Sequence, residues 1–314
     1  MKLRSHQPLT IAIIAFVLIL AVPIYIGIVS NKIANNLTAE NSVQQETLSD
    51  LAAHALESKM DHLEGIAVAM ASSTELQTDM AAGNWTASAA YVRDILNDVQ
   101  FYDPYIDRVG IVDASGIQQA AYPELQGGIG ISVASSSWYQ VIQSGAPVAV
   151  SNVTKRVSVP QILVVNVGAP VTKNGKNIGY VVLQIPTDHF LQFEQVISLG
   201  VYGFAYIVDS AGNVVAHPRY SADTGDVVNL SMVPAVAAVE NGESGTLIET
   251  VSGEESVITY KPVAHYHWGI ITQEPYGQAF GVRDSIVWSF VGEAFAIILV
   301  DFLIAYLIYR TLKK

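Results

Sequence analysis

The chain has 314 residues, a formal net charge of −12, a hydrophobic fraction of 51% and no cysteine. Without cysteine it can form no disulfide, thiolate metal site or thiol nucleophile, and its acidic balance argues against nucleic acid or anionic lipid headgroups as partners. Aromatic and β-branched residues run through the middle of the chain, so we expect this part to bury a core and fold.

Two long apolar runs lie near the ends of the sequence, at Leu9–Val29 and Ile286–Tyr309. At about 1.5 Å of rise per residue, each run is long enough as a helix to cross a hydrocarbon layer roughly 30 Å thick. The first run is too long for the core of a typical signal peptide, and no small-x-small cleavage motif follows it, which favours an uncleaved anchor over a cleaved signal. We predict transmembrane helices at 9–30 and 286–309.

Basic residues next to the two runs predict their orientation, because Lys and Arg beside a span stay on the cytoplasmic side. Such residues precede the first run and follow the second, at positions 2, 4, 310, 313 and 314. We therefore expect a two-pass protein of the cell membrane, with cytoplasmic ends at 1–8 and 310–314 and an extracytoplasmic part at 32–283.

Two carboxylates, Glu293 and Asp301, lie inside the second run, where a charged group is costly and needs a reason. The first run carries no basic residue that could pair with them. Three explanations stay open: contact with polar or cationic residues of a partner's membrane helices, neutral or snorkelled carboxyls within a bundle, or an ion path. The first would allow the protein to meet a partner inside the membrane.

The segment 31–82 follows the first run, and we predict that it forms a stalk helix. It contains no proline, and its apolar residues recur at steps of three and four, as in Leu56, Met60, Leu63, Ala67 and Met70. Such a stripe can pack on its own domain or form a dimer with a second copy of the chain, and the two arrangements can coexist.

Beyond Gly83, short β-rich runs are separated by glycine, proline, asparagine and aspartate. We expect helices at 91–100, 138–144 and 189–197. We expect strands at 108–112, 162–167, 179–185, 205–208, 245–250 and 255–260. This pattern predicts a mixed α+β fold with antiparallel sheets and not a regular alternation of strand and helix.

One motif occurs twice, as IVDASG at 111–116 and as IVDSAG at 207–212. In both copies a buried strand ends in Asp and a Gly turn, which is the chemistry of a hairpin. Each copy is followed by a Pro-Val pair of strands, around Pro170 and Pro262. We predict two tandem modules of one type, a distal module at 83–192 and a proximal module at 193–285.

In this order the pieces resemble a double Cache sensor domain, the extracytoplasmic ligand-binding module of many prokaryotic chemoreceptors, sensor kinases and cyclic-dinucleotide enzymes. The resemblance covers nearly the whole exterior: the stalk, the hairpin at 112–116, Trp138-Tyr139 opening a helix, and 203–212 followed by His217-Pro218. It implies a PAS-like fold for each module, small-molecule binding in the distal module, and a homodimer formed through the stalk.

The resemblance also implies where a ligand lies. In family members that bind amino acids, an Arg two positions before this Trp holds the ligand carboxylate, and an acidic residue on a later strand takes the amine. In this sequence these positions hold Ser136 and Gln184, which argues against amino acids as ligands. The candidate ligand-binding residues are Tyr122, Trp138, Tyr139, Asn152, Thr154, Arg156 and Gln184.

Each candidate also has an ordinary structural explanation. The two aromatic residues at 138 and 139 suit core packing equally well. Arg156 can be a solvent-exposed charge on a strand or in a turn. If it faces a pocket instead, its guanidinium would pair with an acidic ligand through two hydrogen bonds.

His265 and His267 form a pair that, on a strand, would place both rings on one face. No third metal ligand is recognisable, and the sequence has no nucleophile elbow, phosphate loop or zinc-protease helix. We expect no enzymatic activity, no cofactor and no metal.

The function that we predict is a membrane-anchored sensor that binds a small solute in the distal module and signals to a separate or fused transducer. Only four residues follow Arg310, so the sequence is expected to be either the input half of a longer receptor or a stand-alone sensory subunit. The alternative is a non-signalling surface module for solute capture or adhesion.

Overall fold

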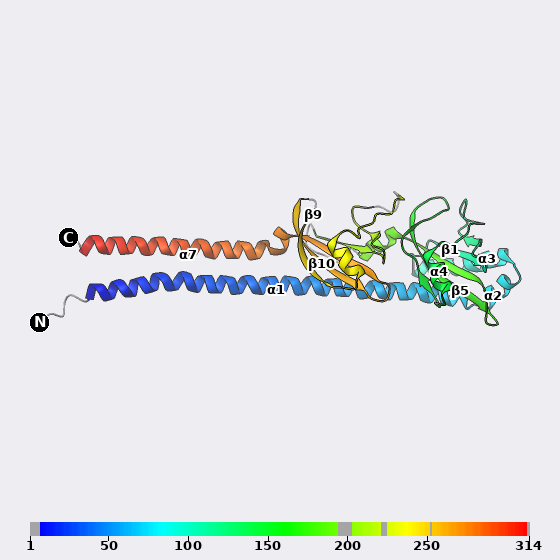
Figure 1. The fold of residues 1–314 in the computed structure, drawn as a ribbon, viewed down its shortest axis with the longest axis horizontal. Helices are drawn as coiled ribbons and strands as arrows, with labels where there is room; N and C mark the ends of the chain where they lie inside the picture. The colour runs from blue at the N-terminus through cyan, green and yellow to red at the C-terminus, as the bar shows by residue number, and fades with distance from the viewer. Residues whose placement is uncertain (1–6, 194–202, 221–224, 252, 313–314) are drawn as a thin grey trace. The chain divides into compact units, whose positions relative to one another are not determined.

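The computed structural model describes residues 7–193, 203–220, 225–251 and 253–312. It contains a long N-terminal helix, two antiparallel sheets with short helices, and a long C-terminal helix (Figure 1). The mixed α+β class predicted from the sequence is confirmed. The terminal residues 1–6 and 313–314 lie outside the described residues.

Helix α1 (Gln7–Ala71) contains both the first apolar run and most of the predicted stalk. The helix ends earlier than expected, and α2 (Thr74–Ala81) starts after a break of two serines. Ser73 causes this restart, because its side-chain oxygen accepts a hydrogen bond from the N–H of Leu76 at 3.4 Å. The predicted apolar stripe of α1 is buried in the chain's own core, at Leu56, Met60, Leu63, Ala67 and Met70. The homodimer stays a prediction.

Helix α7 (Tyr276–Leu312) contains the second apolar run. Its residues Tyr276–Ile304 form a stretch that is long and apolar enough to cross a membrane. Within the part of the chain that the structure describes, this is the one such stretch. The first predicted span, 9–30, is helical within α1, but the side chains of residues 7–20 are not among those described.

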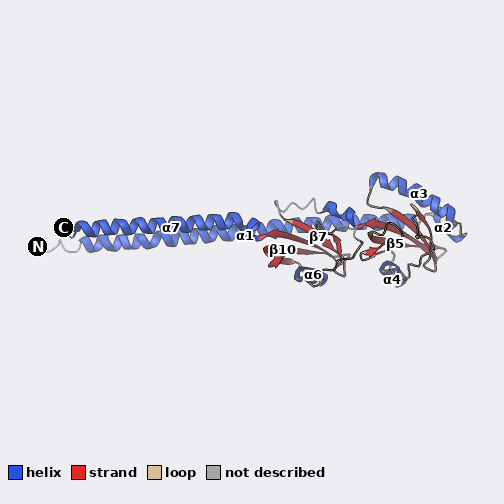
Figure 2. Cartoon of the chain, turned by 90° about the horizontal axis from the view of Figure 1, so that it is seen from above, coloured by secondary structure: helices blue, strands red, loops and turns tan. Residues whose placement is uncertain are grey.

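The first sheet has the strand order β2-β1-β6-β5-β3, with β4 also paired to β5. Its strands are β1 (Arg108–Asp113), β2 (Gln118–Tyr122), β3 (Ala149–Val150), β4 (Thr154–Lys155), β5 (Leu163–Lys173) and β6 (Lys176–Pro186). Helices α3 (Trp85–Tyr102) and α4 (Ser137–Gln143) lie on opposite sides of this sheet (Figure 2). Helix α3 begins before the expected residue 91 because Asn84 caps it, accepting from the N–H of Ala87.

The second sheet has the order β8-β7-β11-β10-β9, so its inner strands repeat the arrangement of the first. Its strands are β7 (Phe204–Val208), β8 (Val214–Ala216), β9 (Gly245–Val251), β10 (Glu254–Val263) and β11 (Trp268–Pro275), with helix α6 (Pro234–Glu240). Between the sheets, the helix expected at 189–197 starts as a 3₁₀ turn, η1 (Thr187–Leu191), and residues 194–202 lie outside the described part.

The repeated motif forms the same hairpin in both modules. Oδ1 of Asp113 accepts from the backbone N–H groups two and four residues later, at 2.8 and 3.1 Å. Oδ1 of Asp209 does the same at 2.9 and 3.0 Å. Gly116 and Gly212 have φ values of 81° and 71°, a conformation that glycine adopts at little cost. The predicted hairpin repeat is confirmed.

One large hydrophobic core contains residues of α1 and of both sheets, and a smaller cluster lies around Trp138 and Tyr180. Phe190 of η1 is fully buried and packs edge-to-face on Tyr105, with ring centroids 6.0 Å apart, and on Trp268 of β11, at 5.8 Å. Residues 45–249 and 256–274 accordingly form one compact unit.

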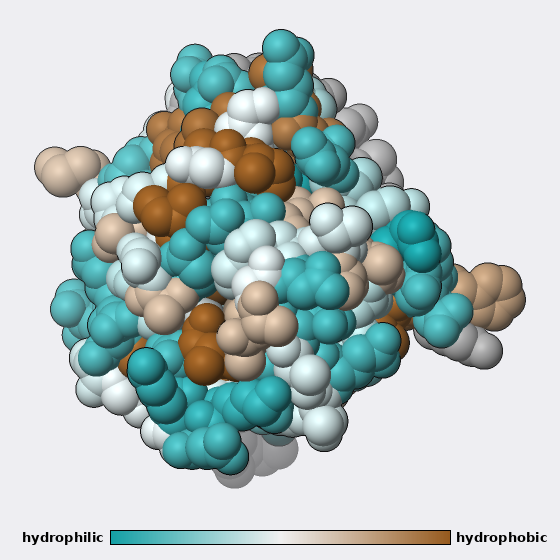
Figure 3. All heavy atoms as spheres, turned by 90° about the vertical axis from the view of Figure 1, so that its right-hand side faces the viewer, coloured by the Kyte–Doolittle hydropathy of each residue, from teal (hydrophilic) through white to brown (hydrophobic). Residues whose placement is uncertain are grey.

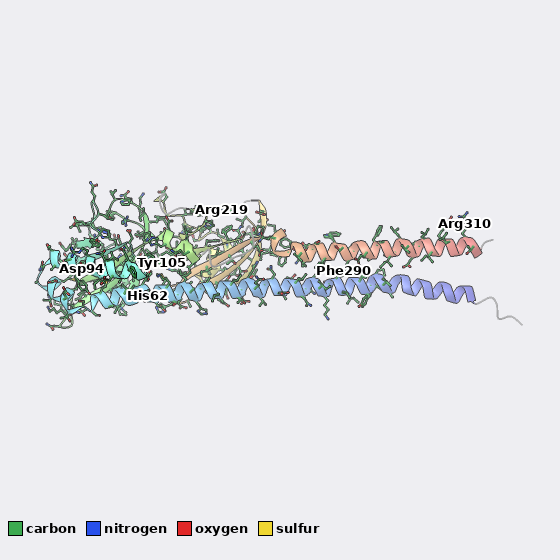
Figure 4. All side chains as sticks on the ribbon, turned by 180° about the vertical axis from the view of Figure 1, so that it is seen from behind. His62, Asp94, Tyr105, Arg219, Phe290 and Arg310 are labelled. Carbon is green, nitrogen blue, oxygen red and sulfur yellow. The ribbon has the colours of Figure 1, made fainter. Side chains whose placement is uncertain are left out.

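An ion cluster fixes α1 to the end of α3. Lys59 bonds the carboxylate of Asp103 at 2.6 Å and lies 3.8 Å from the centre of the Tyr105 ring. His62 lies 3.2 Å from the same carboxylate (Figure 4 labels His62 and Tyr105). On the face of the molecule at the α2 end, hydrophilic residues predominate and hydrophobic ones form separate groups (Figure 3).

Candidate functional site

The distal module contains a cavity of about 240 Å³, which we call the distal cavity. It is lined by β1, β5 and β6 of the first sheet, by the segment 131–138 that leads into α4, and by 154–158. Sites for drug-sized ligands measure roughly 300–1,000 Å³, so this volume suits a smaller metabolite.

Arg108, the first residue of β1, places a buried guanidinium at this cavity; the residue is 1% exposed. Its Nε donates to the carbonyl oxygen of Pro123 at 2.9 Å, and its Nη1 donates to Oε1 of Gln184 at 3.4 Å. Its Nη2 has no hydrogen-bond partner among the described residues. Burial, together with the nearby charge of Arg156, lowers the pKa of Arg108 to about 10, so the group is still positive at neutral pH.

Arg156 supplies a second guanidinium from the segment after β4. Its side chain is 3% exposed, and its Nη1 bonds Oδ2 of Asp107 at 2.6 Å. Its Nε donates to the carbonyl oxygen of Pro160. The structure therefore rules out the alternative of a solvated turn charge, and it places Arg156 on the wall of the distal cavity.

A chain of neutral polar groups continues along the wall from Arg108. Nε2 of Gln184 donates to Oδ1 of Asn166 at 3.2 Å, and Nδ2 of Asn166 lies 3.3 Å from Oγ1 of Thr154. Because the amide N–H of Gln184 is used in this way, its oxygen is turned toward Arg108. The network fixes the orientation of both amides.

Trp138 forms an apolar part of the cavity wall and is 1% exposed. Its ring lies over Gly168 of β5 so closely that a Cβ at residue 168 would be 2.2 Å from it. Ser136, at the position where the resemblance implies an Arg in members that bind amino acids, also lines the cavity.

The structure brings together part of the predicted ligand-binding set. The predicted residues on the wall of the distal cavity are Trp138, Thr154, Arg156 and Gln184. Their role in ligand binding stays a prediction.

The other predicted residues lie elsewhere. Tyr139 packs on the ring of Tyr180, with centroids 5.1 Å apart. Asn152 accepts a hydrogen bond from Ser210 of the proximal module at 2.8 Å, and Tyr122 packs against the hydrophobic core from the end of β2.

Sequence reasoning missed Arg108, Gln118 and Asn166, all of which are buried at the cavity. A signal was available for two of them. Arg108 comes directly before the apolar residues 109–112 of β1, and Asn166 interrupts the apolar run of β5. A buried polar residue needs a partner, so such positions are candidates for a site.

The histidine pair lies in a turn and not on a strand. Residues 264–267 connect β10 to β11, and His267 has a positive φ of 54°. Over the described ranges, no group of three His, Asp or Glu residues could hold a metal ion. Glu293 and Asp301 both lie on α7, where Glu293 is exposed and Asp301 is half-buried.

Two tandem antiparallel sheets on one long helix, with a polar cavity in the distal module, are the arrangement of a double Cache domain. The family model for the Cache domain, dCache_1, matches residues 27–282, and the chain belongs to this family. Domains of this family are extracytoplasmic sensor domains of membrane receptors.

Solved structures show the same fold. The ligand-binding domain of the Pseudomonas fluorescens chemoreceptor CtaA, in complex with L-isoleucine, is 14% identical with a TM-score of 0.58, covering 80% of this chain and 98% of that one. The ligand-binding domain of the Pseudomonas aeruginosa PAO1 amino acid chemoreceptor PctB, in complex with L-Gln, is 14% identical with a TM-score of 0.59, covering 76% and 92%. No curated protein matches the sequence.

Proposed function

We propose that the protein is a membrane-anchored extracytoplasmic sensor that binds a small solute in the distal cavity and signals across the membrane to a separate or fused transducer. The observation that carries this proposal is a polar cavity in the distal module with an unpartnered, buried guanidinium N–H on its wall. A buried donor left without an acceptor costs free energy, which a ligand oxygen would recover. Membership of a family of sensor domains supports the same function.

The proposal includes two membrane helices, at 9–30 and 286–309, with both ends of the chain in the cytoplasm. The apolar part of α7 supports the second helix, and the apolar run with basic residues before it supports the first. We further propose that Glu293 and Asp301 contact polar or cationic groups of a signalling partner within the membrane.

The proposed signal starts at the cavity wall. Val153 precedes the cavity residue Thr154, and its backbone N–H donates to Oδ2 of Asp209 in the proximal hairpin at 2.7 Å. Strand β7 ends beside this Asp and pairs with β11, which leads directly into α7. A ligand that moves the wall would therefore shift the proximal hairpin, and a small shift of one membrane helix is the usual output of such receptors.

The test uses the full chain in lipid nanodiscs, with spin labels on the two membrane helices. A library of amino acids, amines, carboxylates and purines is first screened for compounds that raise the unfolding midpoint; at about a hundred times its dissociation constant, a ligand stabilises by about 2.7 kcal/mol. The sensor proposal requires that a compound found in this way also changes the distance between the spin labels. Binding without a distance change would support solute capture instead.

A further inference from the structure

We infer that the distal cavity recognises a small organic carboxylate that carries no ammonium group. This inference rests on the proposed function, since it names the class of ligand for the same cavity. Its starting point is the balance of charge: the described residues on the wall include Arg108, Lys155 and Arg156 but no Asp or Glu.

The nearest carboxylates neutralise only part of this charge. Asp107 is already paired with Arg156, and it is 38% exposed at the side chain. Asp107 and Glu124 both favour the charged form of Arg108, but neither makes a hydrogen bond or ion pair with it in the described structure, and Glu124 is exposed. The guanidinium of Arg108 is thus a buried cation without a directly paired carboxylate, which a ligand can supply.

Two buried donors lack partners at this cavity. Nη2 of Arg108 and Oγ of Ser158 are both buried without a hydrogen bond in the described structure, and both residues are 1% exposed. A buried donor left unsatisfied costs free energy, which a ligand oxygen recovers. A carboxylate supplies two acceptor oxygens with a full negative charge, the geometry that guanidinium groups bind best.

The wall offers an ammonium group no carboxylate among its described residues, and two of its amide oxygens already accept one hydrogen bond each. Oε1 of Gln184 accepts from Arg108, and Oδ1 of Asn166 accepts from Gln184. An ammonium in the cavity would lose its water, gain no free carboxylate and face two guanidinium groups. An amino acid would carry this penalty in addition to the favourable carboxylate contact.

The rest of the wall suits a short apolar body. Trp138, Val164 and Val182 line the cavity together with its polar residues. The volume of about 240 Å³ limits the ligand to a small acid.

The decisive experiment compares ligands that differ by one group. Binding to the full chain in nanodiscs is measured by calorimetry for propionate, alanine and propylamine, and for the pair succinate and aspartate. We expect at least one of the two plain carboxylates to bind, and each amino acid to bind at least tenfold more weakly than its deaminated counterpart. Propylamine is expected not to bind.

Variants then connect the binding to the cavity. Arg108→Gln and Arg108→Lys should raise the dissociation constant of the carboxylate by about 30-fold or more. The Gln variant loses the buried positive charge, and the Lys variant keeps the charge but cannot donate two parallel hydrogen bonds to the carboxylate. Arg93→Gln is the matched control, since Arg93 is an exposed residue of α3 paired with Asp94, and it should leave binding unchanged. Gln184→Glu places a carboxylate beside Arg108 and should weaken carboxylate binding similarly.

Each variant is used only if its unfolding midpoint without ligand shows that it folds, and Gln184→Glu provides the test if both Arg108 variants fail. Tighter binding of an amino acid than of its deaminated counterpart would overturn the inference while leaving the sensor proposal intact. Carboxylate binding that persists in the folded variants would overturn the cavity assignment. Binding of inorganic phosphate in preference to both carboxylates would overturn the ligand class.

Discussion

The bond between the two modules can be tested at Asp209. This carboxylate is fully buried and accepts four N–H groups: three within its own hairpin, and the backbone N–H of Val153 in the distal module at 2.7 Å. Asp209→Asn keeps the size of the side chain but replaces one acceptor oxygen with an N–H donor. Whichever way the amide turns, at least one buried N–H loses its acceptor.

The expected cost follows from these contacts. A hydrogen bond to a charged group contributes about 1.5–3 kcal/mol, and an unsatisfied buried donor adds a penalty, so we expect a loss of about 2–4 kcal/mol. Asp113→Asn is the matched control, because Asp113 holds the same hairpin in the distal module. Its Oδ2 accepts only from the half-buried side chain of Gln119, which can rotate, so about 1 kcal/mol is expected.

The assay is thermal unfolding of both variants beside the unmodified chain at neutral pH. The two costs differ by about 1–3 kcal/mol, so at about 2–4 °C per kcal/mol for a domain of this size the two midpoints should differ by about 2–12 °C, with Asp209→Asn the lower. Equal midpoints would refute the argument, since the contact with Val153 would then contribute nothing beyond the hairpin itself.

Further predictions concern packing and pH. Gly168→Ala should destabilise the chain by about 1–3 kcal/mol, because its Cβ would push the Trp138 ring, whereas Gly65→Ala, with open space on α1, should be neutral or stabilising; unfolding midpoints distinguish the two. Burial lowers the pKa of His217 to about 4, below its unfolded value of about 6.5. The folded state therefore binds this proton less readily than the unfolded state. Neutral His217 contributes to the free energy of unfolding above pH 6.5, and this contribution, at most about 3 kcal/mol, is lost as the pH falls toward 4. His217→Gln should flatten the fall of the unfolding midpoint over this range, and an unchanged slope would contradict the assignment.

The parts of the fold that depend on local chemistry could be predicted from the sequence. The two hairpins follow from Asp and Gly at fixed positions, which select one turn whatever surrounds them. The break at Ser73 was missed because apolar residues continue at helical spacing on both sides of it. Helix α6 was missed because its seven residues, starting at Pro234, are too few to show a helical repeat of apolar residues.

The site was less predictable, because its residues meet through strand register. Arg108 and Gln184 are 76 positions apart, and they become neighbours because β1 pairs with β6 at that point. Asn166 faces the same Gln184 from β5. A shift of one residue in either pairing would turn these side chains to the other face of the sheet, and register depends on the packing of the whole sheet.

The shared core limits how such receptors can be recombined. Phe190 lies between Tyr105 of the distal module and Trp268 of the second sheet, so a boundary placed between the modules would cut through buried aromatic contacts. A chimera that exchanged the distal module alone would have to rebuild this packing at the junction. A transplant meant to give a new receptor the same ligand preference should therefore carry residues 45–274 as one piece.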